Sequence, residues 1–78
     1  MTHEKKILPE YFKEVAEGNK TFELRKDEGY QVGDILILKE WDKEYTGLYV
    51  KRIISYVLRD VPQYGLMEGY CILGLRCK

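Results

Sequence analysis

One segment with helical spacing lies near the N-terminus, and the later apolar segments have the spacing of strands. Pro9 can open the helix, because its fixed φ and missing N–H suit a first helical position. Phe12 and Val15 then recur at helical spacing, and Gly18 is the expected stop. A short strand at residues 6–8 is expected before this helix. A single early helix excludes an array of βαβ units, which need a helix between successive parallel strands.

Four strand-like segments follow the helix. They are residues 21–25, 35–41, 48–58 and 70–77. Apolar residues at consecutive positions in 35–38 favour a strand covered on both faces near the middle of the sheet. In the third segment the alternation slips at Lys51 and Arg52, as a β-bulge would make it do. Gly74 permits a bend in the last segment.

These elements predict a fold of the α+β class. A chain of 78 residues is too short for two lobes, so we expect a single domain over residues 1–78. The arrangement that buries the apolar faces and hides strand edges is a small β-barrel of about five strands, with the N-terminal helix covering one end.

The charge balance limits the kind of partner. Thirteen basic and thirteen acidic residues cancel, so the field of the whole chain cannot attract nucleic acid. A polyanionic partner would therefore need a local basic patch.

The two cysteines are expected to pack as reduced thiols. Within one extended segment Cys71 and Cys77 would lie about 20 Å apart, which is too far for a disulfide. With His3 as the one histidine there are too few soft ligands for zinc, so no metal or cofactor is predicted. No secretory signal or membrane-length apolar run occurs in the sequence, so we expect a cytoplasmic protein with no membrane contact.

The segment TFELR, residues 21–25, carries the main candidate site. A regular strand places Thr21, Glu23 and Arg25 on one face, about 6–7 Å apart, with Lys20 just before them. Phe22 lies on the opposite face and is expected in the core. A carboxylate between cations can form the floor of a binding site, or it can be a solvated surface pair contributing about 0–1 kcal/mol. Spacing leaves both interpretations open.

Several tyrosines fall at element ends or in loops: Tyr11, Tyr30, Tyr45 and Tyr64. Tyrosine can stack on an unpaired base at the rim of a cleft. It can equally cap a small core with one apolar and one wet side.

The stretch EGNKTFELR, followed by VGD, resembles the G-x-K-x-x-E-x-R and downstream G-D pattern of ASCH domains. These belong to the PUA-like superfamily of small RNA-associated β-barrels. The resemblance covers nearly the whole chain and is closest to a short bacterial and phage branch of unknown function. Asp34 of the G-D pair is expected to accept backbone hydrogen bonds in its turn.

The resemblance implies a cleft between the helix and the sheet, faced by Lys20, Glu23 and Arg25. Related domains bind RNA or modified nucleosides, and the expected ligand is one of these. The expected ligand-binding residues are Lys6, Lys20, Glu23, Arg25 and Tyr30.

Two alternatives remain open. An enzyme branch of the family hydrolyses N4-acetylcytidine with a Lys and a Thr three residues later, and here Lys20 matches while Glu23 replaces the Thr. The catalytic candidates of a minimal hydrolase are therefore Glu23 as general base and Lys20 as stabiliser of an oxyanion. The other alternative is a protein-binding domain that uses an apolar, aromatic surface.

Overall fold

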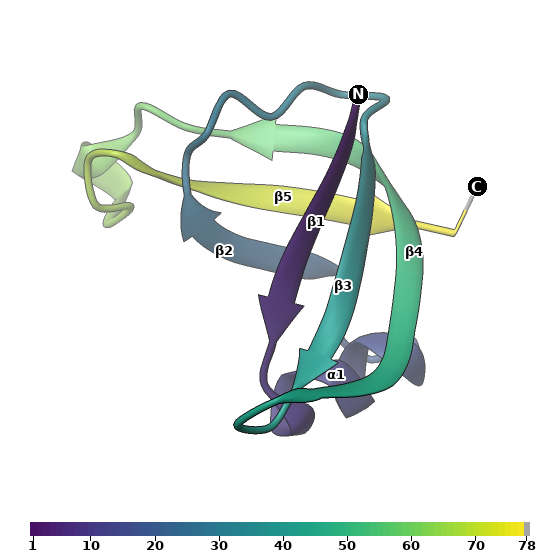
Figure 1. The fold of residues 1–78 in the computed structure, drawn as a ribbon. Coiled ribbons are helices and arrows are strands. Elements are labelled where there is room, and N and C mark those ends of the chain that lie inside the picture. Colours follow the sequence, from purple (N-terminus) through teal and green to yellow (C-terminus); the bar gives the residue numbers. More distant parts are fainter. Residues whose placement is uncertain (78) are drawn as a thin grey trace.

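The structure is a computed structural model that describes residues 1–77 (Figure 1). In chain order the elements are β1 (Thr2–Ile7), α1 (Pro9–Ala16), β2 (Phe22–Lys26), β3 (Ile35–Trp41), β4 (Tyr45–Leu58), the 3-10 helix η1 (Pro62–Tyr64) and β5 (Tyr70–Arg76). The expected α+β class, with one early α-helix and five strands, is confirmed.

The five strands form one mixed sheet in the order β1-β3-β4-β5-β2. β1 pairs with β3 in parallel, and the other neighbours are antiparallel. The sheet curls into a half-barrel, so its two edge strands, β1 and β2, approach each other. Side chains link these edges, because Arg25 Nη2 donates to the Lys6 carbonyl oxygen and Lys5 pairs with Glu28 in the loop that follows β2.

The helix covers one end of the half-barrel, against β3 and β4 (Figure 1). Pro9 occupies its first turn, and Phe12 and Val15 are buried, as their spacing predicts. The Glu17 N–H closes the last turn on the Lys13 carbonyl at 3.0 Å. Within residues 1–77 no helix has the length and apolar character needed to cross a membrane.

The core fills the concave side of the sheet and the space under the helix. Its buried members are Ile7, Phe12, Val15, Tyr30, Leu36, Leu38, Ile54, Cys71, Leu73 and Leu75. Leu36 and Leu38 have no exposed surface, because β3 lies between β1 and β4 and beneath α1. Each fully buried side chain of this size contributes about 1.5–3 kcal/mol relative to an exposed one.

Several predicted strand boundaries are wrong, and among them β4 begins at Tyr45 rather than at residue 48. The first strand begins at Thr2 rather than at residue 6, because the inward positions His3 and Lys5 are polar like the outward ones, so β1 shows no apolar alternation before Ile7. The last strand ends at Arg76, and Cys77 is exposed beyond it rather than packed in the core. Cys71 is buried as expected.

The predicted bulge at Lys51 and Arg52 is also misplaced. Both residues pair regularly with β3. Arg52 points inward, where its Nη2 donates to the Val15 carbonyl of α1 at 3.0 Å, so a cation occupies an inward position in the alternation. The β4–β5 register instead shifts between Ile54 and Tyr56, beside Gly74 of β5.

Candidate functional site

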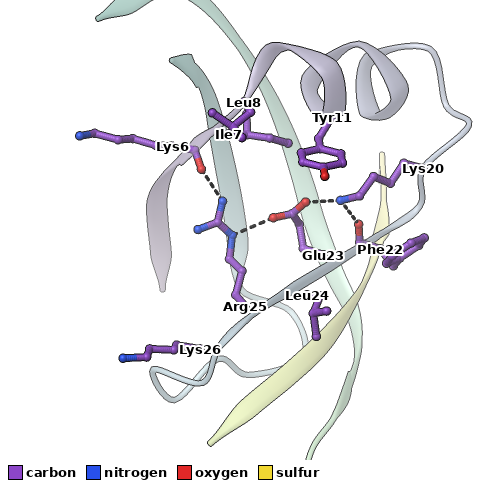
Figure 2. A pocket seen from close by; sticks show the side chains of 10 residues that line it. All are labelled: Lys6, Ile7, Leu8, Tyr11, Lys20, Phe22, Glu23, Leu24, Arg25 and Lys26. Carbon is purple, nitrogen blue, oxygen red and sulfur yellow. Dashed lines mark hydrogen bonds and ion pairs between the residues drawn. The ribbon is translucent and has the colours of Figure 1, made fainter. Parts of the chain in front are cut away.

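A cleft of about 570 Å³ opens between the β1–α1 junction and the edge strand β2 (Figure 2). Its lining residues are Lys6, Ile7, Leu8, Tyr11, Lys20, Phe22, Glu23, Leu24, Arg25 and Lys26. The cleft therefore lies where the two edges of the half-barrel meet. Its volume falls within the range of about 300–1,000 Å³ typical of small-molecule sites.

Strand β2 turns its charged face inward and its apolar face outward. Glu23 is 4% exposed, whereas Phe22 is 48% and Leu24 57% exposed. The core position predicted for Phe22 is therefore wrong. A strand in the middle of a sheet could not easily be oriented this way, but β2 is an edge strand beside a cleft, where cations can satisfy an inward carboxylate.

Glu23 is held between two cations that come from its own strand and from the segment before it (Figure 2). Lys20 Nζ donates to Glu23 Oε1 and also to the Phe22 carbonyl oxygen, the latter at 2.8 Å. Arg25 Nε donates to Glu23 Oε2 at 2.7 Å. Both carboxylate oxygens are thus occupied, which offsets the cost of burying the charge.

The same cations keep hydrogen-bond donors for a ligand. An ammonium group has three N–H donors, and Lys20 uses two of them within the chain. Arg25 binds through Nε and Nη2, and its Nη1 has no hydrogen-bond partner within residues 1–77. These donors suit phosphate, carbonyl or carboxylate oxygens.

Exposed apolar side chains form the walls of the cleft. Leu8 is 47% and Tyr11 48% exposed on the side of α1, while Phe22 and Leu24, on the outward face of β2, line the outer margin. Lys20 Nζ lies 5.0 Å from the Phe22 ring centroid and 5.9 Å from that of Tyr11. Apolar walls around a few convergent polar groups are typical of sites for organic ligands with a planar ring.

Two of the predicted binding residues lie differently from expectation. Lys6 contributes its carbonyl oxygen to the cleft, while its side chain points away from Glu23 and its Nζ lies 4.7 Å from the Trp41 ring centroid (Figure 2). Tyr30 is 1% exposed and is not a lining residue, so the predicted rim position is wrong.

Sequence reasoning missed Leu8 and Leu24 as cleft walls. Leu24 lies between Glu23 and Arg25, and both faces of an edge strand can be accessible. Its position in the sequence could therefore have indicated a residue that lines the cleft. Among the tyrosines placed at element ends, Tyr11 lines the cleft, whereas Tyr45 and Tyr64 do not.

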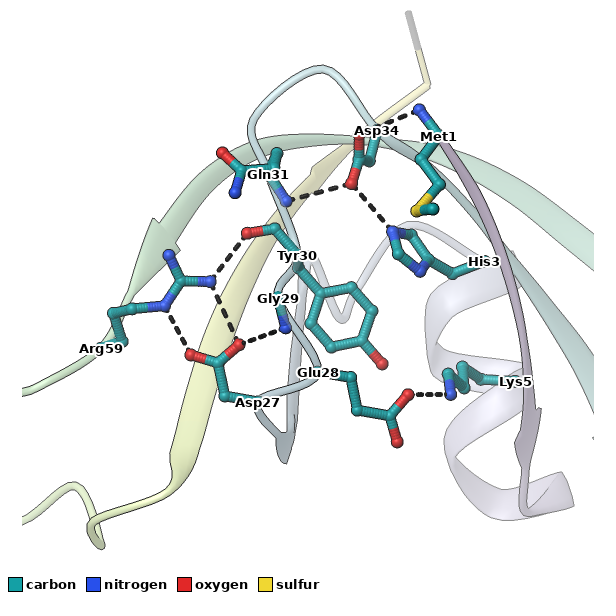
Figure 3. A network of polar contacts seen from close by, with 10 residues as sticks. All are labelled: Met1, His3, Lys5, Asp27, Glu28, Gly29, Tyr30, Gln31, Asp34 and Arg59. Atoms are coloured by element: carbon teal, nitrogen blue, oxygen red, sulfur yellow. Dashed lines mark hydrogen bonds and ion pairs between the residues drawn. The ribbon is translucent and has the colours of Figure 1, made fainter.

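A second polar network fixes the loop between β2 and β3, residues 27–34 (Figure 3). Arg59 Nη2 donates to Asp27 Oδ1 at 3.1 Å and to the Tyr30 carbonyl oxygen at 2.7 Å. The hydrogen bonds from Arg59 lower the pKa of Asp27. The Tyr30 ring packs against the His3 ring, with centroids 4.6 Å apart. Tyr30 thus anchors this loop in the core.

Asp34 ends that loop and binds the start of the chain. Its Oδ2 accepts from the Gln31 N–H at 3.1 Å, which confirms the expected backbone hydrogen bond in the turn. It also lies 2.8 Å from His3 Nε2, and Oδ1 accepts from the Met1 ammonium at 3.1 Å. The hydrogen bond with His3, followed by that from the ammonium, lowers the pKa of Asp34 to about 2. Within residues 1–77 no group of three or more His, Cys, Asp or Glu side chains is placed to hold a metal ion.

The chain is similar to a described protein family and to a curated phage protein. Residues 2–75 match a family described as "Domain of unknown function (DUF3850)". A curated relative, the "Uncharacterized 12.9 kDa protein in GpA 3'region" of Escherichia phage P2, is 38% identical over 73 residues. The match covers 91% of this chain but 64% of the relative, so the chain spans less than two thirds of the relative's length.

Proposed function

The chain belongs to the family described as "Domain of unknown function (DUF3850)", and we propose that it binds RNA or a modified nucleoside in the cleft between the β1–α1 junction and β2. One observation carries this proposal. A buried carboxylate, Glu23, is fixed between Lys20 and Arg25 at the floor of a cleft whose walls are exposed and apolar. Such a floor can bind the polar edge of a base while the walls cover its faces.

The charge around the cleft supports a ligand that carries phosphate. Four of the lining residues are cations, against the single carboxylate of Glu23; Lys20 and Arg25 bind that carboxylate, whereas the side chains of Lys6 and Lys26 point away from it and place their charges beside the cleft. The chain has no net charge, so this is the kind of local patch that a polyanionic partner requires.

We also propose that the fold is of the ASCH, PUA-like type. Three residues of the G-x-K-x-x-E-x-R pattern, Lys20, Glu23 and Arg25, converge at one cleft, as that resemblance implies. The G-D pair contributes differently, because Asp34 belongs to the loop network rather than to the cleft lining.

Binding accounts for the geometry better than hydrolysis does. A general base must have an oxygen free to take a proton from water. Each oxygen of Glu23 accepts one hydrogen bond, from Lys20 or Arg25, and keeps a second lone pair, but the residue is only 4% exposed, so a water has little access to it. Incubation with acetylated nucleosides, followed by chromatography, tests this directly, and turnover would favour the hydrolase.

The proposal is tested by amide-correlation NMR, in which labelled protein is titrated with short single-stranded RNAs and a panel of modified nucleosides. We expect shifts clustered over residues 20–25. Lys20→Gln should weaken binding at least tenfold, since a hydrogen bond to a charged group contributes about 1.5–3 kcal/mol. Lys20→Arg should retain most of the affinity because it keeps the charge.

Lys13→Gln is the matched control, because Lys13 is exposed on α1 and does not line the cleft. Thermal unfolding of each variant shows whether it is folded. Shifts that avoid residues 20–25 for every ligand, or equal affinity of the Lys20→Gln and Lys13→Gln proteins, would contradict the proposal. A protein partner captured equally well by wild type and Lys20→Gln would favour the protein-binding alternative.

A further inference from the structure

A second group of aromatic and basic side chains lies on the face of β1, β3 and β4 that points away from the core. The strand registers place Lys6 beside Lys39, and Lys39 beside Tyr49. Trp41 pairs with Tyr45 farther along β3 and β4. Because side chains alternate across a strand, Lys6, Lys39 and Tyr49 share one face. The β3–β4 register shifts between Lys39 and Trp41, and contacts with the Lys6 and Lys39 side chains place the Trp41 and Tyr45 rings on the same face. We call this group the outer strip, which consists of Lys6, Lys39, Trp41, Tyr45, Tyr49 and Lys51.

The cations of the outer strip lie over its rings. Lys6 Nζ is 4.7 Å from the Trp41 ring centroid and 5.7 Å from that of Tyr45. Lys39 Nζ is 5.2 Å from the Tyr45 ring centroid. Tyr45 is nevertheless 53% and Tyr49 63% exposed, so both rings remain accessible. An accessible ring beside a cation suits a nucleotide, whose base can stack on the ring while its phosphate meets the cation.

The outer strip is continuous with the cleft. Lys6 lines the cleft and also contacts the rings of Trp41 and Tyr45. Beyond them a shallow hollow of about 300 Å³ is lined by Glu4, Ile37, Lys39, Tyr49 and Lys51. A ligand longer than one nucleotide can therefore pass from the cleft around the edge strand β1 and onto the outer strip.

The charges of the outer strip favour an anionic occupant over an apolar protein surface. Lys39 pairs with Glu4 at 3.0 Å. Lys6 and Lys51 have no ion-pair partner in the part of the chain that the structure describes. The carboxylates of Asp42 and Glu44, in the turn that follows Trp41, limit the strip at that end. The unpaired cations lie on the side of the strip nearer the cleft and the hollow.

We propose that the ligand is a single-stranded RNA of several nucleotides. One nucleotide occupies the cleft, and the following ones cross Lys6 and stack on Tyr45 and Tyr49. This inference rests on the proposed function, because the cleft holds one end of the strand. It goes further by assigning the outer strip to the RNA and by excluding a free nucleoside as the complete ligand.

Trp41 provides a direct reporter for this inference. It is the one tryptophan of the chain, and it belongs to the outer strip but does not line the cleft. We would titrate the protein with uridine oligonucleotides, from the mononucleotide to about six residues, while recording tryptophan emission and the Kd. The mononucleotide should leave the emission unchanged, whereas the longer oligonucleotides should quench it and bind more tightly.

Matched variants separate stacking from a general effect on the fold. Tyr45→Ala and Tyr49→Ala should each weaken binding of the hexanucleotide at least about fivefold, as loss of one stacked base does. Tyr49→Phe keeps the ring and should bind like wild type. Tyr64→Ala removes a tyrosine that is 83% exposed on η1, outside the strip, and should have no effect. Unfolding midpoints check that the variants are folded.

The outcomes distinguish this inference from the proposed function. If Lys20→Gln weakens binding but affinity does not rise with length and Tyr49→Ala has no effect, the outer strip is not a site and the cleft function stands. If the two tyrosine variants weaken binding and Lys20→Gln does not, the path through the cleft is wrong. Absence of binding for every oligonucleotide overturns both proposals.

Discussion

At the level of single residues, Glu23 connects the stability of the chain to its candidate site. Its carboxylate is buried, and its partners Lys20 and Arg25 are themselves mostly covered. Removing one charged side chain from a buried ionic group leaves the remaining charges unpaired. The free energy of unfolding then falls by more than the intact group contributes to it. Arg25 therefore serves both the site and the seam between β1 and β2, because it binds Glu23 and the Lys6 carbonyl oxygen.

Glu23→Gln should lower the free energy of unfolding by about 1–3 kcal/mol, because both cations lose a counter-charge in a partly buried position. In urea unfolding this loss appears as a lower midpoint urea concentration, with an unchanged dependence of the free energy of unfolding on urea concentration. Glu28→Gln is the matched control, since Glu28 also pairs with a lysine but its side chain is 54% exposed. Equal effects of the two substitutions would show that burial of Glu23 has no energetic consequence.

The pKa of Asp34, lowered to about 2 by His3 and the Met1 ammonium, makes stability depend on pH in the acid range. A carboxyl whose pKa is lower in the folded chain stabilises the fold fully above its unfolded value, and this contribution is lost as the pH falls. Urea unfolding should therefore show stability falling between about pH 5 and pH 2. Asp34→Asn should be less stable at neutral pH and show a shallower decline; an unchanged profile would contradict the assignment.

At the level of elements, the sequence predicted more about periodicity than about orientation. The alternation of TFELR correctly groups Glu23 with Arg25, opposite Phe22 and Leu24. It does not say which face turns inward, since that depends on the curl of the sheet and on β2 being an edge strand. The predicted helix is confirmed. Its signals are local in the sequence: Pro9 at the start, the spacing of the buried Phe12 and Val15, and Gly18 after the end.

Contacts between distant segments account for what the sequence did not reveal. Arg52 interrupts the alternation of β4 because it binds the carbonyl of Val15 on α1. Tyr30 lies in a loop by sequence, yet Arg59 binds its carbonyl and the ring is buried in the core. Neither contact has a signal within a short window of sequence.

The irregular pairing of β4 with β5 depends on a glycine. A Cβ atom on Gly74 would lie 3.1 Å from Ser55 Oγ and 3.3 Å from Tyr56 Cβ. Gly74→Ala should therefore destabilise the fold by about 1–3 kcal/mol, as overpacking does, measured by urea unfolding. Adding Ser55→Gly removes the nearer atom and should recover part of the loss. If the Gly74→Ala protein is as stable as wild type, the backbone at the register shift must move enough to accommodate the added Cβ atom.

At the level of the whole molecule, the half-barrel is closed by side chains rather than by a strand ladder. β1 and β2 are not neighbours in the sheet. Arg25 of β2 binds the Lys6 carbonyl of β1, and Lys5 of β1 pairs with Glu28 in the loop that follows β2. The cleft lies in this seam. The space for a ligand thus arises because the sheet is left open between its edges.

The parallel pairing of β1 with β3 has a further consequence, for the order of folding. It joins Thr2 to Ile35 across α1 and β2, whereas β3 and β4 form a local hairpin. Because distant contacts carry a larger entropy of loop closure, we expect the hairpin to form early and β1 to dock late. In stopped-flow kinetics, Val50→Ala in the hairpin should then slow refolding, while Ile7→Val in β1 should mainly speed unfolding. The reverse pattern would contradict this order. A nascent or partly unfolded chain would accordingly retain the β3–β4 hairpin while lacking the cleft, so ligand binding would report that folding is complete.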